Sequence, residues 1–256
     1  MTSQELTGLS LERLLAAQTP WGRARLNVGA NRKSLKWLLV VYTPSFVKRA
    51  LDIIVSAIAI LLLLPVFLGI ALLVMLDGVP VFFSQTRIGL NGRGFRMFKF
   101  RSMCVDAEER LNELLAENGK ASCKTFKMKD DPRITRIGKL LRKSSLDELP
   151  QFWNVLRGDM SLVGPRPAAP REVALYSLAD RDRLKVKPGM TCLWQVGERH
   201  GGFWEIGDRN TIDFPEQVSL DVRYYLENQG NGWRPVVKDF WLLAKTALVI
   251  LSGKGM

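Results

Sequence analysis

Histidine and cysteine are both scarce in this sequence of 256 residues. The one histidine, His200, would have to carry any imidazole-centred chemistry alone, which disfavours a histidine metal triad or an imidazole-activated nucleophile. The three cysteines, Cys104, Cys123 and Cys192, form no C-x-x-C pair, so they suit a reducing compartment and offer no zinc framework. Carboxylates, lysines and arginines are therefore the groups from which a reaction centre would be built.

Acidic residues are in the minority, because 25 Asp and Glu stand against 37 Lys and Arg, for a formal net charge of +12. The basic excess lies in residues 1–49 and 82–145, on either side of an apolar run. This placement favours an anionic phospholipid surface as the partner, and we expect no nucleic-acid binding. Residues 1–45 are interpreted as a basic amphipathic N-terminal extension, and a loosely ordered basic tail is the alternative.

The apolar run extends from Ile53 to Leu76, 24 residues without a charge, against the roughly 20 that a membrane-spanning helix needs. Pro65 is expected to break it into two limbs of about twelve residues, each roughly 18 Å long and shorter than a hydrocarbon core of about 30 Å. Basic residues on both flanks place both ends in the cytoplasm. We therefore predict a re-entrant helix-break-helix hairpin over residues 46–80, with a kinked transmembrane helix as the alternative.

The rest of the chain predicts a small α+β domain over residues 81–256. Two strands are expected around Asn91-Gly92, a pair that supplies the positive φ angles of a tight hairpin. A helix is expected over 105–119, and residues 130–142 form an amphipathic helix whose basic face suits phospholipid headgroups. The apolar stretch after Asp239 is too short to cross a bilayer, so we expect it to dock on the domain or on the membrane interface.

The densest polar cluster lies at residues 144–151. The adjacent carboxylates of Asp147 and Glu148 suit phosphoryl transfer, in which one attacks phosphorus and the other holds a divalent ion. The alternative is structural, because Ser145 and Glu148 match the S-x-x-E capping box of helix starts. Pro150 weakens this alternative, since it would then be the fifth helical residue, where its missing N–H is unfavourable.

Arg166 stands between Pro165 and Pro167. The two prolines stiffen the backbone, so the guanidinium can bind a diphosphate in a bidentate manner at a lower ordering cost. A rigid surface loop without a ligand is the alternative.

Seven motifs occur in order along the chain: K-R-x-x-D before the broken apolar run, F-x-Q-x-R-x-G, K-F-R-S-M, D-P-R-x-T-R-x-G, S-L-D-E-L-P-Q, N-V-L-x-G-D-M-S-L-V-G-P-R-P and P-G-M-T. Together they resemble the bacterial sugar transferases, the monotopic polyprenyl-phosphate phosphoglycosyltransferases. The resemblance covers about residues 45–250. Cys192 and the segment 197–202 depart from the usual pattern, which puts the choice of sugar in doubt.

The resemblance implies a re-entrant membrane helix broken at Pro65, amphipathic helices on the cytoplasmic leaflet, and a catalytic dyad of Asp147 and Glu148. It also implies a phosphosugar intermediate on Asp147 and Mg²⁺ held by Asp147 and Glu148. The substrate-binding residues expected from the motifs are Lys99, Arg101, Arg142, Gln151, Pro165, Arg166 and Pro167.

The expected activity is therefore the transfer of sugar-1-phosphate from a UDP-sugar to polyprenyl (undecaprenyl) phosphate, with release of UMP. It would initiate exopolysaccharide, O-antigen or glycoconjugate synthesis at the cytoplasmic face of the bacterial inner membrane. A homodimer is left open. An interfacial phosphohydrolase and a non-catalytic membrane scaffold are the alternatives: the first would use water as the acceptor, and the second needs no acidic pair.

Overall fold

The computed structural model describes Thr19 and residues 45–107, 109–110, 131–196, 212, 214–228 and 233–251. Most of the predicted extension 1–45, most of the predicted helix 105–119, and the segment 197–202 lie outside the described residues. The chain divides into two compact units, Met1–Val47 and Lys48–Met256. Both the predicted membrane hairpin and the predicted catalytic domain fall almost entirely within the second unit.

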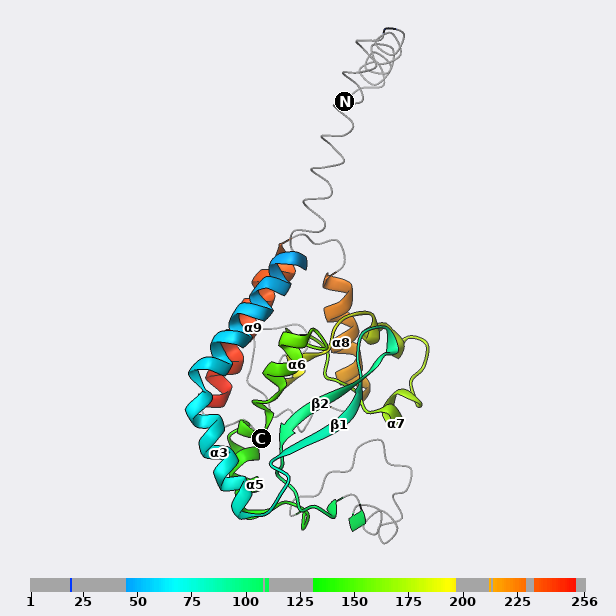
Figure 1. Ribbon diagram of the computed structural model, residues 1–256. Helices are drawn as coiled ribbons and strands as arrows, with labels where there is room; N and C mark the ends of the chain where they lie inside the picture. The colour runs from blue at the N-terminus through cyan, green and yellow to red at the C-terminus, as the bar shows by residue number, and fades with distance from the viewer. Residues whose placement is uncertain are drawn as a thin grey trace. The chain divides into compact units, whose positions relative to one another are not determined.

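The apolar run forms two helices, Ser45–Leu62 and α3 (Leu64–Leu76), bent by 62° where they meet (Figure 1). In the described part of the chain no single helix is long and apolar enough to cross a membrane, whereas this bent pair meets the test of length and composition jointly. Pro65 lies in the first turn of α3, where the missing N–H leaves no helical bond unmade. The predicted break is confirmed, and the first limb is longer than expected because it begins at Ser45.

Two charged residues near the start of the first limb are bound by the domain. The guanidinium of Arg49 donates to the carbonyl oxygens of Val155 at 2.7 Å and Leu156 at 2.9 Å, near the end of a later helix. The carboxylate of Asp52, which is buried, accepts from the N–H of Leu162 at 3.1 Å. The limb is therefore fixed to the domain by hydrogen bonds from and to its charged side chains.

The predicted β-hairpin is confirmed. Strands β1 (Phe82–Ile88) and β2 (Gly94–Phe100) pair antiparallel, in a register that runs from Phe82 opposite Phe100 to Ile88 opposite Gly94. The connection contains a short 3₁₀ turn, η1 (Leu90–Gly92), in which Asn91 has φ 56° and Gly92 has φ 76°. These are the left-handed conformations that Asn-Gly adopts at low cost.

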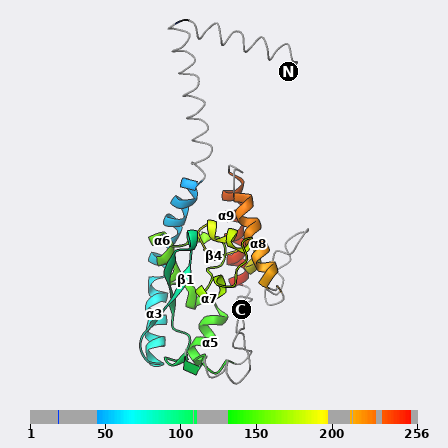
Figure 2. The same ribbon diagram turned by 90° about the vertical axis from the view of Figure 1, so that its right-hand side faces the viewer.

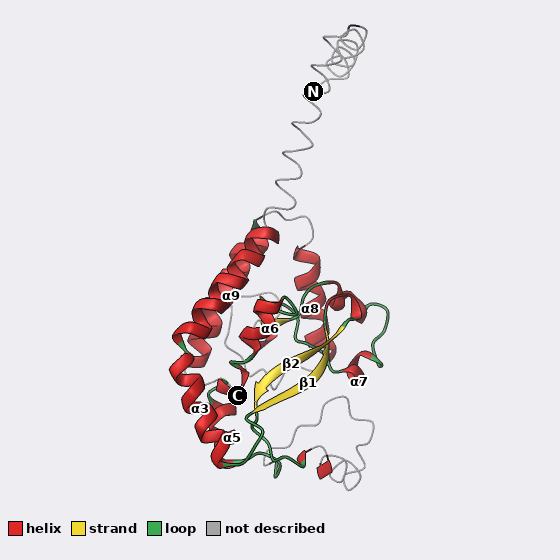
Figure 3. Cartoon of the chain, in the orientation of Figure 1, coloured by secondary structure: helices red, strands yellow, loops and turns green. Residues whose placement is uncertain are grey.

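The remaining described elements complete a mixed α+β arrangement (Figure 3), as predicted for the domain. In chain order they are α5 (Arg136–Lys143), η2 (Leu146–Glu148), α6 (Gln151–Arg157), β3 (Ser161–Val163), α7 (Pro170–Val173), η3 (Asp180–Lys185), β4 (Gly189–Thr191), η4 (Trp194–Val196), α8 (Phe214–Asn228) and α9 (Arg234–Leu251). Strands β3 and β4 pair in parallel. In the view of Figure 2, α3 and α6 lie on one side, α8 and α9 lie on the other, and β1 lies between them.

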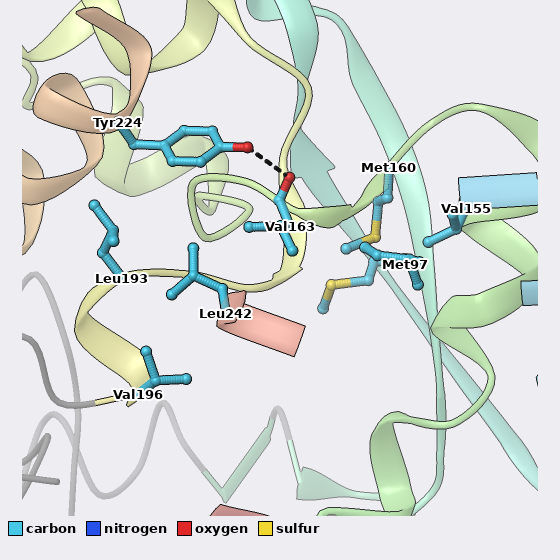
Figure 4. Close-up of a cluster of buried hydrophobic side chains, with 9 residues drawn as sticks. Met97, Val155, Met160, Val163, Leu193, Val196, Tyr224 and Leu242 are labelled. Carbon is cyan, nitrogen blue, oxygen red and sulfur yellow. Dashed lines mark hydrogen bonds between the residues drawn. The ribbon is translucent and has the colours of Figure 1, made fainter. Parts of the chain in front are cut away.

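The main apolar core joins β2, α6, β3, α8 and α9 (Figure 4), and its buried side chains include Met97, Val155, Met160, Val163, Leu193, Tyr224 and Leu242. The hydroxyl of Tyr224 donates to the carbonyl oxygen of Val163 at 3.2 Å, and Asp239 on α9 pairs with Lys48 on the first limb. Leu242 is fully buried, so the predicted docking of the C-terminal apolar stretch on the domain is confirmed.

A second core ties α3 to α5 and β2 through Ile70, Val74, Phe100 and Leu141. Ile137 and Leu141 of α5 therefore pack against protein, while Arg136 and Lys139 are exposed. Leu140 is also exposed, although the sequence pattern predicts it on the apolar side. The two-faced helix predicted over 130–142 is found from Arg136 onward. Arg133, expected on its basic face, is instead buried in an ion pair with Asp131 before the helix begins.

Candidate active site

The acidic pair lies on η2, between α5 and α6. Ser145, just before this turn, is left-handed at φ 56° and ψ 17°, and its side chain makes no capping hydrogen bond. The capping-box interpretation of Ser145 and Glu148 is therefore wrong. Left-handed backbone at a residue other than glycine costs free energy, and such conformations cluster at functional sites. The left-handed conformation of Ser145 follows the end of α5 and directs the chain into the turn that carries Asp147.

Asp147 is 2% exposed, and among the residues that the structure describes its Oδ1 atom has no hydrogen-bond partner. Burial raises the pKa of Asp147, and the neighbouring charge of Glu148 raises it further, while Lys99 and Arg142 act in the opposite direction. A buried carboxylate oxygen without a partner is unfavourable for folding, so it marks a candidate functional group.

Glu148 lies beside Asp147 and is half-buried. Its Oε1 is 2.6 Å from the Nζ of Lys99 on β2. Arg142, in the last turn of α5, donates from Nε to the hydroxyl of Ser102 at 2.9 Å, and its pKa is lowered by burial although Asp147 acts to raise it. The structure thus brings Lys99 and Arg142 together with both acids, as the sequence predicts.

The acidic pair offers carboxylate oxygens, which are the ligands that Mg²⁺ prefers. Among the described residues no group of three or more His, Cys, Asp or Glu side chains is placed to hold a metal ion. Mg²⁺ is commonly held by only one or two carboxylates plus substrate phosphates and water. The unpartnered Oδ1 of Asp147 and the adjacent Glu148 fit that requirement once substrate oxygens supply further ligands.

The loop containing Arg166 is fixed by contacts with β4 and with Trp194. Pro165 and Pro167 are buried and Arg166 is exposed. The N–H of Gly189 donates to the carbonyl oxygen of Pro165 at 2.8 Å, and the guanidinium carbon of Arg166 lies 5.8 Å from the centre of the Trp194 ring. The backbone of this loop is fixed and the guanidinium of Arg166 is exposed, as expected of a residue that binds an anion.

Two glycines allow this loop to approach β4. A Cβ atom at Gly189 would lie 2.1 Å from the backbone nitrogen of Gly164, which no side chain can tolerate. The N–H of Gly164 donates to the carbonyl oxygen of Thr191 at 3.0 Å. The P-G-M-T motif therefore positions the loop that carries Arg166.

Arg183 and Asp221 form a buried ion pair beneath the same loop. Arg183 also donates to the hydroxyl of Tyr176 at 2.9 Å and to the backbone oxygen of Arg166 at 3.3 Å. Burial raises the pKa of Asp221 to about 6, although the charge of Arg183 acts to lower it. This pair is not predictable from local sequence, because its members are 38 residues apart.

Arg87 on β1 was also missed as a site residue. It donates to Gln85 Oε1 at 2.8 Å and to the carbonyl oxygen of Pro167 at 3.5 Å, and its buried Nε has no partner among the described residues. Burial lowers the pKa of Arg87, and the nearby charge of Arg166 lowers it further. The signal was present, since Gln85 and Arg87 are the polar residues of F-x-Q-x-R-x-G.

Arg101 and Gln151, both in the predicted substrate-binding set, are buried. The guanidinium of Arg101 donates to backbone oxygens at and after the end of α3: Val74 at 3.2 Å, Gly78 at 2.6 Å and Pro80 at 2.7 Å. Its described contacts thus stabilise the exit from α3. Gln151 opens α6, three residues after Glu148.

The seven motifs predict a bent apolar helix pair and a domain that carries an acidic pair with basic neighbours. The structure has both features. The chain belongs to the bacterial sugar transferase family, which it matches over residues 43–253. Membership of this family implies association with a membrane.

Three relatives illustrate the similarity. The chain is 44% identical over 214 residues to the galactosyl transferase CpsE of Streptococcus agalactiae, covering 84% of this chain and 44% of that protein. It is 41% identical over 213 residues to the undecaprenyl-phosphate galactose phosphotransferase of Salmonella typhimurium, covering 82% and 41%. It is 41% identical over 212 residues to the exopolysaccharide production protein ExoY of Rhizobium meliloti, covering 81% and 87%. The chain thus spans less than half of the first two relatives and most of the third.

Proposed function

We propose that this protein transfers sugar-1-phosphate from a UDP-sugar to a polyprenyl phosphate and releases UMP, as the first step in building a surface polysaccharide. The observation that carries the proposal is the buried carboxylate of Asp147, whose Oδ1 has no partner among the described residues although cationic side chains surround it. The printed names of two relatives support the substrate classes: one is an undecaprenyl-phosphate galactose phosphotransferase, and another is a UDP-glucose:undecaprenyl-phosphate glucose-1-phosphate transferase.

In the first half-reaction the carboxylate oxygen of Asp147 attacks the phosphorus that bears the sugar. The bond from this phosphorus to the bridging oxygen breaks, and UMP leaves with the electron pair. In the second half-reaction a phosphate oxygen of the acceptor attacks the same phosphorus. The aspartyl bond then breaks, and the carboxylate of Asp147 is restored.

Burial favours this role, because a poorly solvated carboxylate is less stabilised in its ionised form. Lys99 and Arg142 act to keep it ionised. Arg87 and Arg166 are proposed to bind the diphosphate, since both guanidinium groups lie along the loop of Pro167 and the Nε–H of Arg87 lacks a partner among the described residues.

We infer that Mg²⁺ is held by Asp147 and Glu148 together with substrate oxygens. When bound, it supplies neutralisation of the phosphate charges. Gln151, Pro165 and Pro167 are retained as parts of the substrate-binding region. Arg101 is not, because its described hydrogen bonds are to backbone oxygens at the end of α3.

We further infer that the bent helix pair is re-entrant and that the protein sits on the cytoplasmic face of the bacterial inner membrane. The 62° bend at Leu63 supports this, as do the many exposed apolar side chains of both limbs. Basic residues on both flanks favour the same side for both ends. The matched comparison is wild type against Pro65→Ala, each with a single cysteine at position 31 or 119 and with serine at the native cysteines.

Intact cells are labelled with a membrane-impermeant thiol reagent. Wild type should protect both sites, whereas Pro65→Ala should expose position 31 in part of the population, because an unbroken apolar helix is long enough to span. Labelling of position 31 but not 119 in wild type would mean that the segment crosses the membrane.

The activity is tested by incubating the membrane-reconstituted protein with a panel of radiolabelled UDP-sugars, with and without polyprenyl phosphate. We expect one sugar to appear in a polyprenyl diphosphate product with release of UMP. Continuous release of free sugar phosphate without acceptor would identify a phosphohydrolase. Absence of UMP with every donor would indicate a scaffold.

A further inference from the structure

One face of the β-hairpin is turned towards the acidic pair. Side chains alternate between the faces of a strand, and directly opposed residues share a face. The residues on this face are Phe83, Gln85 and Arg87 of β1, opposite Lys99, Met97 and Phe95 of β2, respectively. The ion pair between Lys99 and Glu148, at 2.6 Å, brings this face to the site.

The face changes character along its length. At its turn end, Arg87 hydrogen-bonds the loop of Pro167. At the other end, where β1 begins and β2 finishes (Figure 3), Phe83 is 41% exposed and lies directly opposite Lys99. This end is next to the membrane helices, because Phe100 on the last position of β2 packs against α3.

Phe82 provides an internal contrast. Its ring stacks on Phe100 with centroids 5.2 Å apart, so it lies on the α3 face of the hairpin. Phe83 points the opposite way, towards the side occupied by Lys99. Exposed apolar side chains also continue from the end of α3 through Leu76 and Val79 to the start of β1. Exposed apolar residues therefore follow one another along the chain from the end of α3 to Phe83, the residue opposite Lys99.

We propose that Phe83 and Lys99 form the subsite for the acceptor lipid, with the ring of Phe83 against the first isoprene units and the ammonium of Lys99 beside the phosphate. Opposed residues of a hairpin have Cβ atoms about 5 Å apart, which suits a ligand that joins an apolar chain directly to an anion. The ammonium has three donors, so it can bind a phosphate oxygen while it remains paired with Glu148. This inference rests on the proposed function.

The subsite is tested by equilibrium binding of farnesyl phosphate to the full-length protein in detergent. Farnesyl phosphate is short enough that a general role of Phe83 in membrane anchoring would not affect its binding. We expect Phe83→Ala to weaken binding about tenfold, because an apolar contact surface is lost. Phe83→Leu should retain most of the affinity, since it keeps an apolar side chain.

Phe240→Ala is the matched control, because Phe240 on α9 is 74% exposed and lies far along the chain from the hairpin. It should bind farnesyl phosphate as wild type does. Release of UMP from the UDP-sugar without acceptor should be equal in all four proteins, which also verifies their folding. Turnover with undecaprenyl phosphate should show a raised KM and a little-changed kcat in Phe83→Ala.

Equal affinity of Phe83→Ala and wild type for farnesyl phosphate would overturn the subsite, as would an absence of binding by wild type. If wild type binds farnesyl phosphate with the expected dependence on Phe83 but releases no UMP from any UDP-sugar, the subsite stands and the proposed function fails. The two failures are therefore distinguishable.

Discussion

Two regions of this molecule each bury one aspartate, and they treat it differently. Asp221 on α8 is 1% exposed and pairs with Arg183, while Asp147 on η2 is 2% exposed and has an oxygen without a partner among the described residues. Burial raises the pKa of both carboxyls. The comparison separates a carboxylate that is fully paired beneath a loop from the one that we propose as the nucleophile.

The surroundings explain the difference. Arg183 is itself buried and is also bound to Tyr176, so the pair with Asp221 is closed to solvent and ligands. Around Asp147 the nearest cations are Lys99, which is bound to Glu148, and Arg142, which is bound to Ser102. They act on its charge without forming a hydrogen bond to its buried Oδ1, so this oxygen has no partner among the described residues.

The largest effect should come from Asp147→Asn, which removes the attacking oxyanion with little change in shape. We expect UMP release to fall by about 10⁴-fold or more, because loss of a nucleophile removes the covalent route. The free energy of unfolding should not fall, since the substitution removes a buried charge. A variant that keeps a substantial fraction of the wild-type rate would exclude Asp147 as the nucleophile.

Arg183→Met should have the opposite effect: the free energy of unfolding should fall, while most of the activity remains. Leaving the partner charge buried and unpaired typically costs about 3–5 kcal/mol. In wild type the pKa of Asp221 is raised to about 6 from 3.8, so the folded state holds a proton over that window and stability declines as pH rises through it. The loss in Arg183→Met should therefore be larger at pH 8 than at pH 5, as measured by denaturant unfolding in detergent.

The control is the double variant Arg183→Met with Asp221→Leu, which removes both charges and should recover most of the lost stability. If the double variant were as unstable as the single one, loss of packing would explain the effect better than an unpaired charge. A small deficit in activity should remain in the double variant, because the backbone oxygen of Arg166 loses its donor.

Glu148→Gln should raise the Mg²⁺ concentration needed for half-maximal activity by about tenfold or more, because even loss of an outer-shell partner costs that much in metal affinity. Stability should change little, since Glu148 is half-buried. A chelator should abolish wild-type activity, and added Mg²⁺ should restore it. Wild-type turnover after exhaustive metal removal would disprove the metal role.

The smallest expected effect concerns pH. Lys99 lowers the pKa of Asp147, so Lys99→Met should raise it. If Asp147 is the nucleophile, as proposed, it attacks in its ionised form, so activity should fall as pH decreases through this pKa. The acidic limb of the profile should therefore move to higher pH in Lys99→Met. Arg142→Met should shift it in the same direction by a smaller amount. An acidic limb that is unchanged in single-turnover UMP release would contradict this arrangement.

Local chemistry accounts for what the sequence predicted correctly. Asn91-Gly92 specifies a tight turn through its own backbone preferences, and Pro65 interrupts a helix through its own missing N–H. The roles of Arg101 and Arg87 depend on contacts made after folding: one donates to the end of α3 and the other to the loop of Pro167. Nothing in the residues next to Arg101 and Arg87 predicts which of these contacts each one makes.

The sequence predicts the acidic residues of the site but not the residues that hold its loops in place. Asp147 and Glu148 stand out because adjacent carboxylates in an apolar context are unusual, and Lys99 belongs to a neighbouring motif. The capping box failed because Ser145 takes a left-handed conformation, which turns its backbone away from the geometry of a helix start. The support given by Arg183 could not be inferred, because a pairing with Asp221 becomes visible only when α8 packs against η3.

The contact between Lys48 and Asp239 joins residues that are 191 positions apart. At a synthesis rate of about 5–20 residues per second, roughly 10–40 s separate the appearance of the two on the ribosome. Throughout that interval the first limb can already lie in the lipid, with the ammonium of Lys48 at the bilayer surface and not yet paired with Asp239. Folding of this region then depends on α9, which is synthesised late, reaching a helix that is already in place.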